Sequence, residues 1–159
     1  MLEALTYDDV LLLPQYSDIT SRTEIDVTVD LGRSLKLDLP IFSSPMDTVT
    51  GWSMSVAMSE AGGSGVIHRY NTPEQQAAMV AKAVSMGATN VGAAVGVSGD
   101  YLDRAEECAK EGAKFICVDV AHGHHSLMKD ALKHIRYELG TWFPIIAGNV
   151  ATLEGINDL

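Results

Sequence analysis

The chain has 159 residues, of which 47% are hydrophobic and 20% are charged, and its formal net charge is −10 at pH 7. This is the composition of an ordinary globular protein, and the length favours a single domain. The acidic excess argues against a nucleic-acid surface, which needs clustered lysine and arginine. No apolar run is long enough for a membrane span, and the N-terminus lacks the layout of a signal peptide, so we expect a cytoplasmic protein without membrane contact.

The first 38 residues differ in pattern from the rest and are expected to form an N-terminal extension. Within it, residues 24–31 alternate between polar and apolar side chains, which predicts a small strand or hairpin. From residue 39 onward short apolar runs alternate with helical patterns, which is typical of a parallel βα sheet. We expect strands near residues 39–43, 65–68, 91–95, 115–118 and 144–147. We expect helices near residues 51–61, 72–86, 100–111 and 126–139, and a fifth that begins near Leu153.

Capping signals mark the helix boundaries. Thr72 is a good N-cap, Pro73 suits the first helical position, and Gln75 completes a capping box. Asp100 and Ser126 are expected to cap the two following helices. Left-handed C-terminal glycines are expected at Gly87, Gly112 and Gly140.

Two folds accommodate this pattern of elements. Five parallel strands with helices on both faces, in about 150 residues, would give a flavodoxin-like doubly wound domain, which the pattern alone slightly favours. The alternative is part of a (β/α)₈ barrel, whose full form typically needs about 250 residues. In both folds the functional residues follow the carboxyl ends of the strands.

Several side chains follow the predicted strands and are therefore candidate site residues. They are Ser43, Ser44, Met46, Asp47, His68, Arg69, Gly96, Ser98, Asp119, His122, His124, Gly148, Asn149 and Thr152. Asp119 ends a buried strand, where a carboxylate without a partner is costly, so we favour ligand contact over a turn cap. Asn149 could orient a ligand through its amide or could close the turn.

Metal and thiol chemistry are poorly supported. The histidines at 122, 124 and 125 suggest zinc, but no further ligands stand at suitable spacing, so we expect no metal site. Cys108 and Cys117 are expected to be reduced, buried core residues rather than nucleophiles. The chain has no P-loop, no nucleophile elbow and no dinucleotide-binding fingerprint.

Six segments, in order along the chain, resemble the inosine monophosphate (IMP) dehydrogenase and guanosine monophosphate (GMP) reductase family. They are residues 5–14, 43–50, 62–68, 92–96, 119–124 and 147–152. The resemblance implies a (β/α)₈ barrel in place of the doubly wound fold. Residues 1–159 would then form a single domain that holds a partial barrel. The extension would span residues 1–38, and the first five βα units would span residues 39–159.

The resemblance also implies roles for individual residues. Ser44, Met46 and Asn149 match positions that bind the purine nucleotide, whereas Asp119 and Gly148 match positions at the nicotinamide cofactor, NAD or NADP. The family transfers a hydride at C2 of the purine after a cysteine thiolate adds to that carbon. That cysteine follows the sixth strand, so we expect it beyond Leu159, and we expect no catalytic residue in this chain.

The choice within the family rests on opposing signals. Residues 86–90 join the second helix to the third strand without the regulatory insert of most dehydrogenases, and residues 67–70 and 119–123 also favour a reductase. Residues 43–50 and 92–96 favour a dehydrogenase, which we prefer.

Three hypotheses follow for the activity of the chain. It would be part of an IMP dehydrogenase, inactive alone and completed by a C-terminal half-barrel polypeptide. Alternatively, it would be part of a GMP reductase, or a noncatalytic nucleotide-binding or interaction protein. The resemblance further implies a homo-oligomer.

Overall fold

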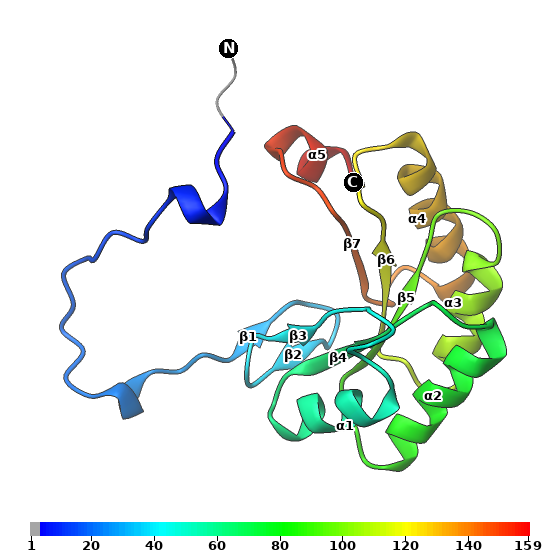
Figure 1. The fold of residues 1–159 in the computed structure, drawn as a ribbon, viewed down its shortest axis with the longest axis horizontal. Helices are drawn as coiled ribbons and strands as arrows, with labels where there is room; N and C mark the ends of the chain where they lie inside the picture. The colour runs from blue at the N-terminus through cyan, green and yellow to red at the C-terminus, as the bar shows by residue number, and fades with distance from the viewer. Residues whose placement is uncertain (1–3) are drawn as a thin grey trace.

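The computed structural model describes residues 4–159 and contains one parallel sheet of five strands (Figure 1). The strands are β3 (Phe42–Ser43), β4 (Ser64–Ile67), β5 (Val91–Val95), β6 (Phe115–Asp119) and β7 (Ile145–Gly148), and they neighbour one another in chain order. A doubly wound sheet reverses its strand order near the middle, and this sheet does not. The sheet curls into part of a barrel instead. The doubly wound fold that the pattern alone favoured was therefore wrong, and the partial barrel is confirmed.

Helices cover the outer side of the curled sheet (Figure 1). They are α1 (Trp52–Glu60), α2 (Pro73–Ser85), α3 (Tyr101–Lys110) and α4 (Ser126–Leu139), and a short α5 (Leu153–Asp158) follows β7. Because side chains alternate along a strand, Val91, Ala93 and Val95 all face these helices and are fully buried. The main hydrophobic core therefore lies between the sheet and its helices.

A second, smaller core fills the inner side of the sheet. It contains the buried residues Leu35, Val66, Ala94 and Phe115. Gly92 leaves room for the Phe115 ring, since a Cβ atom at Gly92 would lie 2.2 Å from that ring. Phe42 packs edge-on against Phe115, with ring centroids 5.7 Å apart. One aromatic ring thus connects β3, β5 and β6 on the inner side.

The N-terminal region forms a hairpin and an extended arm. Strands β1 (Val29–Asp30) and β2 (Lys36–Leu37) pair antiparallel, so a hairpin forms, but only residues 29–30 of the predicted segment 24–31 are strand and the partner strand lies beyond it. The arm, residues 4–28, contains only the one-turn helices η1 (Tyr7–Asp9) and η2 (Arg22–Glu24) and runs away from the barrel (Figure 1). Its hydrogen bonds join groups at most four positions apart. Residues 1–3 of the predicted extension lie outside the described part of the chain.

The helix ends confirm most of the capping signals and correct two of them. Thr72 and Gln75 form the predicted capping box, and glycines 87, 112 and 140 all have positive φ. Ser126 is not the N-cap of α4, because His125 occupies that position and its ring accepts from the Leu127 amide. Asp100 stands at the N-cap of α3, but its carboxylate binds Arg104 instead of a backbone amide.

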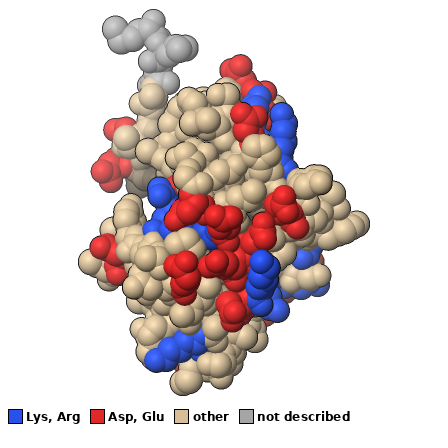
Figure 2. Space-filling view, turned by 90° about the vertical axis from the view of Figure 1, so that its right-hand side faces the viewer, with Lys and Arg blue, Asp and Glu red and all other residues tan. Residues whose placement is uncertain are grey.

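The outer helical face is acidic. Figure 2 shows Asp and Glu side chains gathered in the middle of this face, with lysines beside them. Shallow hollows over α2 and α3 are lined by Glu74, Asp103, Glu106, Glu107 and Glu111. Such a face repels a polyanion, which agrees with the argument against nucleic acid. Among residues 4–159, no helix has the length and apolar character that a membrane crossing requires.

Candidate functional site

The loop after β3 folds back on itself at the carboxyl edge of the sheet. The Thr50 hydroxyl donates to the Ser44 carbonyl at 2.6 Å and lies 2.9 Å from the Ser43 hydroxyl. The amides of Val49 and Thr50 both donate to the Met46 carbonyl at 3.0 Å. Thr50 is fully buried, whereas Ser44 and Met46 are exposed. The loop is therefore anchored from inside while the two predicted nucleotide-binding side chains remain open to a ligand.

The loop after β4 places the positively charged side chain of Arg69 across the carboxyl edge of the sheet. The His68 amide donates to the Thr50 carbonyl at 3.2 Å, which joins this loop to the preceding one. Arg69 extends over Gly96 and places its guanidinium 3.5 Å from the carbonyl oxygen of Asp119. Within residues 4–159, no carboxylate lies within 4.0 Å of this guanidinium, so it remains available to an anionic ligand.

The loops after β6 and β7 are fastened together. Asp119 stands opposite Gly148 in the parallel ladder, the Val120 amide donates to the Gly148 carbonyl at 3.0 Å, and the Asn149 amide donates to the Val120 carbonyl at 2.8 Å. The Gly123 amide donates to the Asn149 carbonyl at 2.7 Å. A Cβ atom at Gly123 would lie 2.9 Å from that oxygen, so only glycine allows this approach. The structure thus brings Asp119, Gly148 and Asn149 side by side.

Asp119 faces the inner side of the barrel at its carboxyl end. The alternation along β6 puts it on the same face as Phe115 and Cys117, and its side chain is half-buried. No group in residues 4–159 donates a hydrogen bond to this carboxylate. Arg69 instead donates to the main-chain carbonyl oxygen of Asp119. A half-buried carboxylate with free acceptor positions can take hydrogen bonds from ligand hydroxyls.

Neither cysteine is suited to nucleophilic attack. Burial raises the pKa of the Cys117 thiol to about 12, and the nearby Asp119 charge adds to the shift. Burial likewise raises the pKa of the Cys108 thiol to about 12. Both thiols are free, and Cys108 is buried as predicted, but Cys117 is only partly buried. The prediction of full burial failed for Cys117 because the inner face of the open barrel is incompletely covered.

The three histidines after β6 diverge. His122 is exposed, His125 caps α4, and the Nε2 atom of His124 lies 3.0 Å from Asp158. Lys129 also binds Asp158, at 2.8 Å, and together these two hydrogen bonds hold the pKa of that carboxyl below its ordinary value. In the described part of the chain, no three potential ligands gather as a metal site would require.

The predicted site residues therefore fall into two groups. Asp119, Gly148 and Asn149 are joined by the bonds between β6 and β7, whereas Ser44 and Met46 lie across the sheet beside β3. No hydrogen bond joins the two groups within residues 4–159. The sequence prediction missed a polar network behind the β4 loop, in which the buried Arg104 binds the buried Gln76, the partly buried Asn71 and the exposed Asp100. Polar side chains on the inner faces of predicted helices were the signal that could have revealed it.

A sequence model of the family described as "IMP dehydrogenase / GMP reductase domain" matches residues 4–159. The chain belongs to this family. It is 45% identical to an inosine-5'-monophosphate dehydrogenase of Nitrosopumilus maritimus over 122 residues, which cover 74% of this chain and 25% of the relative. It is 32% identical to a GMP reductase of Pediococcus pentosaceus over 160 residues, which cover 99% of this chain and 48% of the relative.

The alignment with a third relative is longer than this chain. The inosine-5'-monophosphate dehydrogenase of Borreliella burgdorferi is 29% identical over 209 aligned positions, covering 99% of this chain and 50% of the relative. That alignment is about 50 positions longer than this chain of 159 residues. The alignment with the reductase is nearly free of such additions. In these three comparisons, the chain spans about half the length of its relatives or less.

Proposed function

We propose that this chain supplies the first half of a purine-nucleotide site of the IMP dehydrogenase type. The overall reaction would oxidise IMP with NAD and water to xanthosine monophosphate and NADH. The supporting observation is the joined group of Asp119, Gly148 and Asn149 at the carboxyl edge of a barrel sheet that belongs to this family. That edge is where barrel enzymes bind their substrates.

The geometry supports a division of labour between the two groups. Ser44, Met46 and Asn149 would hold the purine nucleotide through exposed side chains. The free carboxylate of Asp119 would accept hydrogen bonds from the cofactor ribose, and Gly148 would let the backbone approach the cofactor. A Cβ atom at Gly148 would meet nothing closer than 3.9 Å, so the space beside it is open. NAD would accept the hydride, while these residues align the two rings.

The attacking thiolate would come from a second half-barrel polypeptide, because both cysteines here have a pKa near 12. Three features support such a partner. Within residues 4–159, the edge strands β3 and β7 each have one unpaired side. The inner residues Phe42 and Ile146 are incompletely covered. The arm also exposes apolar side chains, with Tyr7 98%, Leu12 98% and Tyr16 94% exposed. We further propose that the completed barrel forms a homo-oligomer.

Calorimetric titration of the purified chain with IMP tests the proposed nucleotide site. We expect IMP to bind without turnover and Asn149→Ala to weaken binding about tenfold or more, because the hydrogen bond from its exposed side-chain amide to the nucleotide would be lost. Thr141→Ala is the control, since Thr141 is exposed and precedes β7, at the opposite edge of the sheet from the site. Absence of IMP binding would refute the nucleotide site.

A steady-state assay of NADH formation from IMP and NAD tests the need for the second half. The chain alone should give no NADH, and the chain mixed with a C-terminal half-barrel from a relative should restore activity. Turnover by the chain alone would refute the need for an external thiolate.

The second candidate is a GMP reductase, in which GMP and NADPH give IMP, NADP and ammonia. The observation in its favour is the alignment with the Pediococcus reductase, which lacks the roughly 50 additional positions of the Borreliella alignment. Assaying the completed barrel with GMP and NADPH distinguishes the two reactions. Oxidation of NADPH that depends on GMP, without NADH formation from IMP, would assign the reductase.

A further inference from the structure

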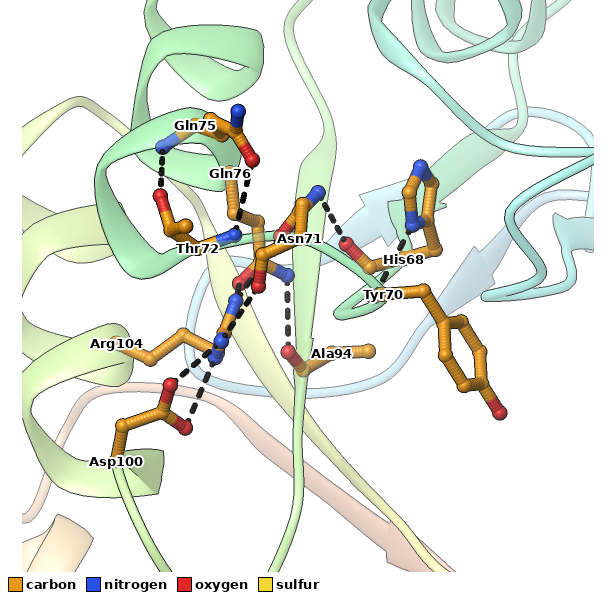
Figure 3. A network of polar contacts seen from close by, with 9 residues as sticks. All are labelled: His68, Tyr70, Asn71, Thr72, Gln75, Gln76, Ala94, Asp100 and Arg104. Carbon is orange, nitrogen blue, oxygen red and sulfur yellow. Dashed lines mark hydrogen bonds and ion pairs between the residues drawn. The ribbon is translucent and has the colours of Figure 1, made fainter.

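A buried arginine lies behind the loop that follows β4 (Figure 3). The Arg104 side chain extends from α3 and the residue is only 4% exposed. Its Nη1 atom donates to Asn71 Oδ1 and Gln76 Oε1, both at 3.0 Å. Its Nη2 atom donates to the Asn71 carbonyl at 2.9 Å and to Asp100 at 2.7 Å, while Nε donates to Asp100 at 3.3 Å. All five donors of the guanidinium are therefore used.

Gln76 extends this network into the sheet. Its side chain is fully buried, and its Nε2 atom donates to the Ile67 carbonyl at 3.0 Å and to the Ala94 carbonyl at 2.9 Å. Arginine has only donors, so the carbonyl oxygen of the Gln76 amide must face Arg104, and the orientation of the amide is fixed. The guanidinium is thereby connected to the carboxyl ends of β4 and β5, where the site begins.

The loop of residues 68–71 depends on these contacts. Arg104 holds Asn71 by both its side chain and its main chain, and Asn71 Nδ2 donates to the His68 carbonyl at 3.2 Å. The Tyr70 amide donates to His68 Nδ1 at 3.2 Å (Figure 3). Arg69 stands between these fixed points, so the direction of its guanidinium over the site follows from the shape of the loop.

We propose that Arg104 is a positioning residue that fixes residues 68–71 and thereby keeps Arg69 over Gly96 and Asp119. Packing between α2 and α3 does not require an arginine, because an apolar side chain of similar size fills such a position without the desolvation cost of a charge. Three of its five bonds reach Asn71 or Gln76, which contact the site loop and the strand ends. The effect on nucleotide binding rests on the proposed function, whereas the effect on the loop does not.

Amide hydrogen exchange tests the positioning role without any ligand. Arg104→Met should raise the exchange rate of the Tyr70 amide about tenfold or more, while amides in β6 keep their rates, because the change is local. Asn71→Ala removes the contact from the loop side and should give the same pattern, which also covers the case in which Arg104→Met fails to fold. Lys110 is an exposed cation of the same helix, so Lys110→Met is the control and should change the exchange rate neither of the Tyr70 amide nor of the β6 amides. Unchanged Tyr70 exchange, or equal acceleration in β6, would overturn the proposal.

Calorimetric titration with IMP and with NAD then tests the consequence for the site. Arg69→Ala and Arg104→Met should each weaken binding of the same nucleotide, and the double variant should bind no more weakly than Arg69→Ala. Arg104→Lys should not restore the affinity, because one ammonium cannot make five directed bonds. Further loss in the double variant would overturn the coupling to Arg69. If neither nucleotide binds the unaltered chain, the proposed function fails, while the exchange result still decides the role of Arg104.

Discussion

The substitution Gly92→Ala should destabilise the inner core through a clash with the Phe115 ring. The second substitution Phe115→Leu should relieve that clash. The Cβ atom of Gly92→Ala would lie 2.2 to 2.8 Å from three carbons of the Phe115 ring, which is fully buried and packed against Phe42. Overpacking of this kind costs about 1–3 kcal/mol. The smaller backbone entropy of unfolded alanine offsets about 0.4–1 kcal/mol of that cost. We expect a net loss of about 1–2 kcal/mol in the free energy of unfolding.

Phe115→Leu removes the ring carbons that clash with the new methyl group. Alone it should cost about 1–2 kcal/mol through lost packing. In the double variant the methyl group fills part of the space, so the coupling energy should be about 1 kcal/mol or more in the favourable direction. Equilibrium unfolding in urea measures all four free energies. Gly51→Ala is the control, since a Cβ atom there meets nothing within 4 Å; Gly51 is the N-cap of α1, so we expect a loss of up to about 1 kcal/mol that is additive with Phe115→Leu. Strict additivity of the two changes would refute the inner packing.

Three further predictions concern thiols, pH and the arm. Cys108 and Cys117 should react with Ellman's reagent on the order of a thousandfold more slowly than free cysteine while the chain is folded, because their pKa values are about 12; prompt labelling would contradict the burial. The pKa of Asp158 is lowered in the fold from 3.8, so its stabilising effect is present above that value and is lost as pH falls through the lower folded pKa. The difference in unfolding free energy between the unaltered chain and Asp158→Asn should therefore vanish in acid, and a difference that persists would contradict the ion pair. A chain that begins at Ser21 should unfold within about 0.5 kcal/mol of the full chain, because residues 4–20 make only local bonds; a larger loss would reveal contacts with the barrel.

Helices and strands were predictable because their signals are local. The strand at residues 91–95 and the helix at residues 126–139 have the predicted bounds, and the other elements differ by a few residues at their ends. Two caps were wrong for reasons outside the local sequence. Asp100 turns toward the buried Arg104, and the ring of His125 takes the position expected for Ser126. Arg104 thus competes with the helix amides for the Asp100 carboxylate, and the His125 ring competes with the Ser126 hydroxyl for the first amides of α4.

The site was predictable only in part. The rule that functional residues follow strands selected Asp119, Gly148 and Asn149, and the structure places them together because β6 and β7 are neighbours. Arg69 was also selected, but the network that holds it was not, since Asn71, Gln76 and Arg104 come from different elements. Their assignments as ligand-binding and positioning residues stay predictions.

The sequence by itself determined the alternation of strands and helices from residue 39 onward, and the family, because these depend on the order of residues along the chain. Only the tertiary structure decided between a doubly wound sheet and a curled one. Local periodicity indicates which residues are buried. The order of the strands depends instead on the side of the sheet along which each connection runs, and no single segment of the sequence encodes that side. The same is true of the buried guanidinium behind the site, whose partners stand 4 to 33 positions away in the chain.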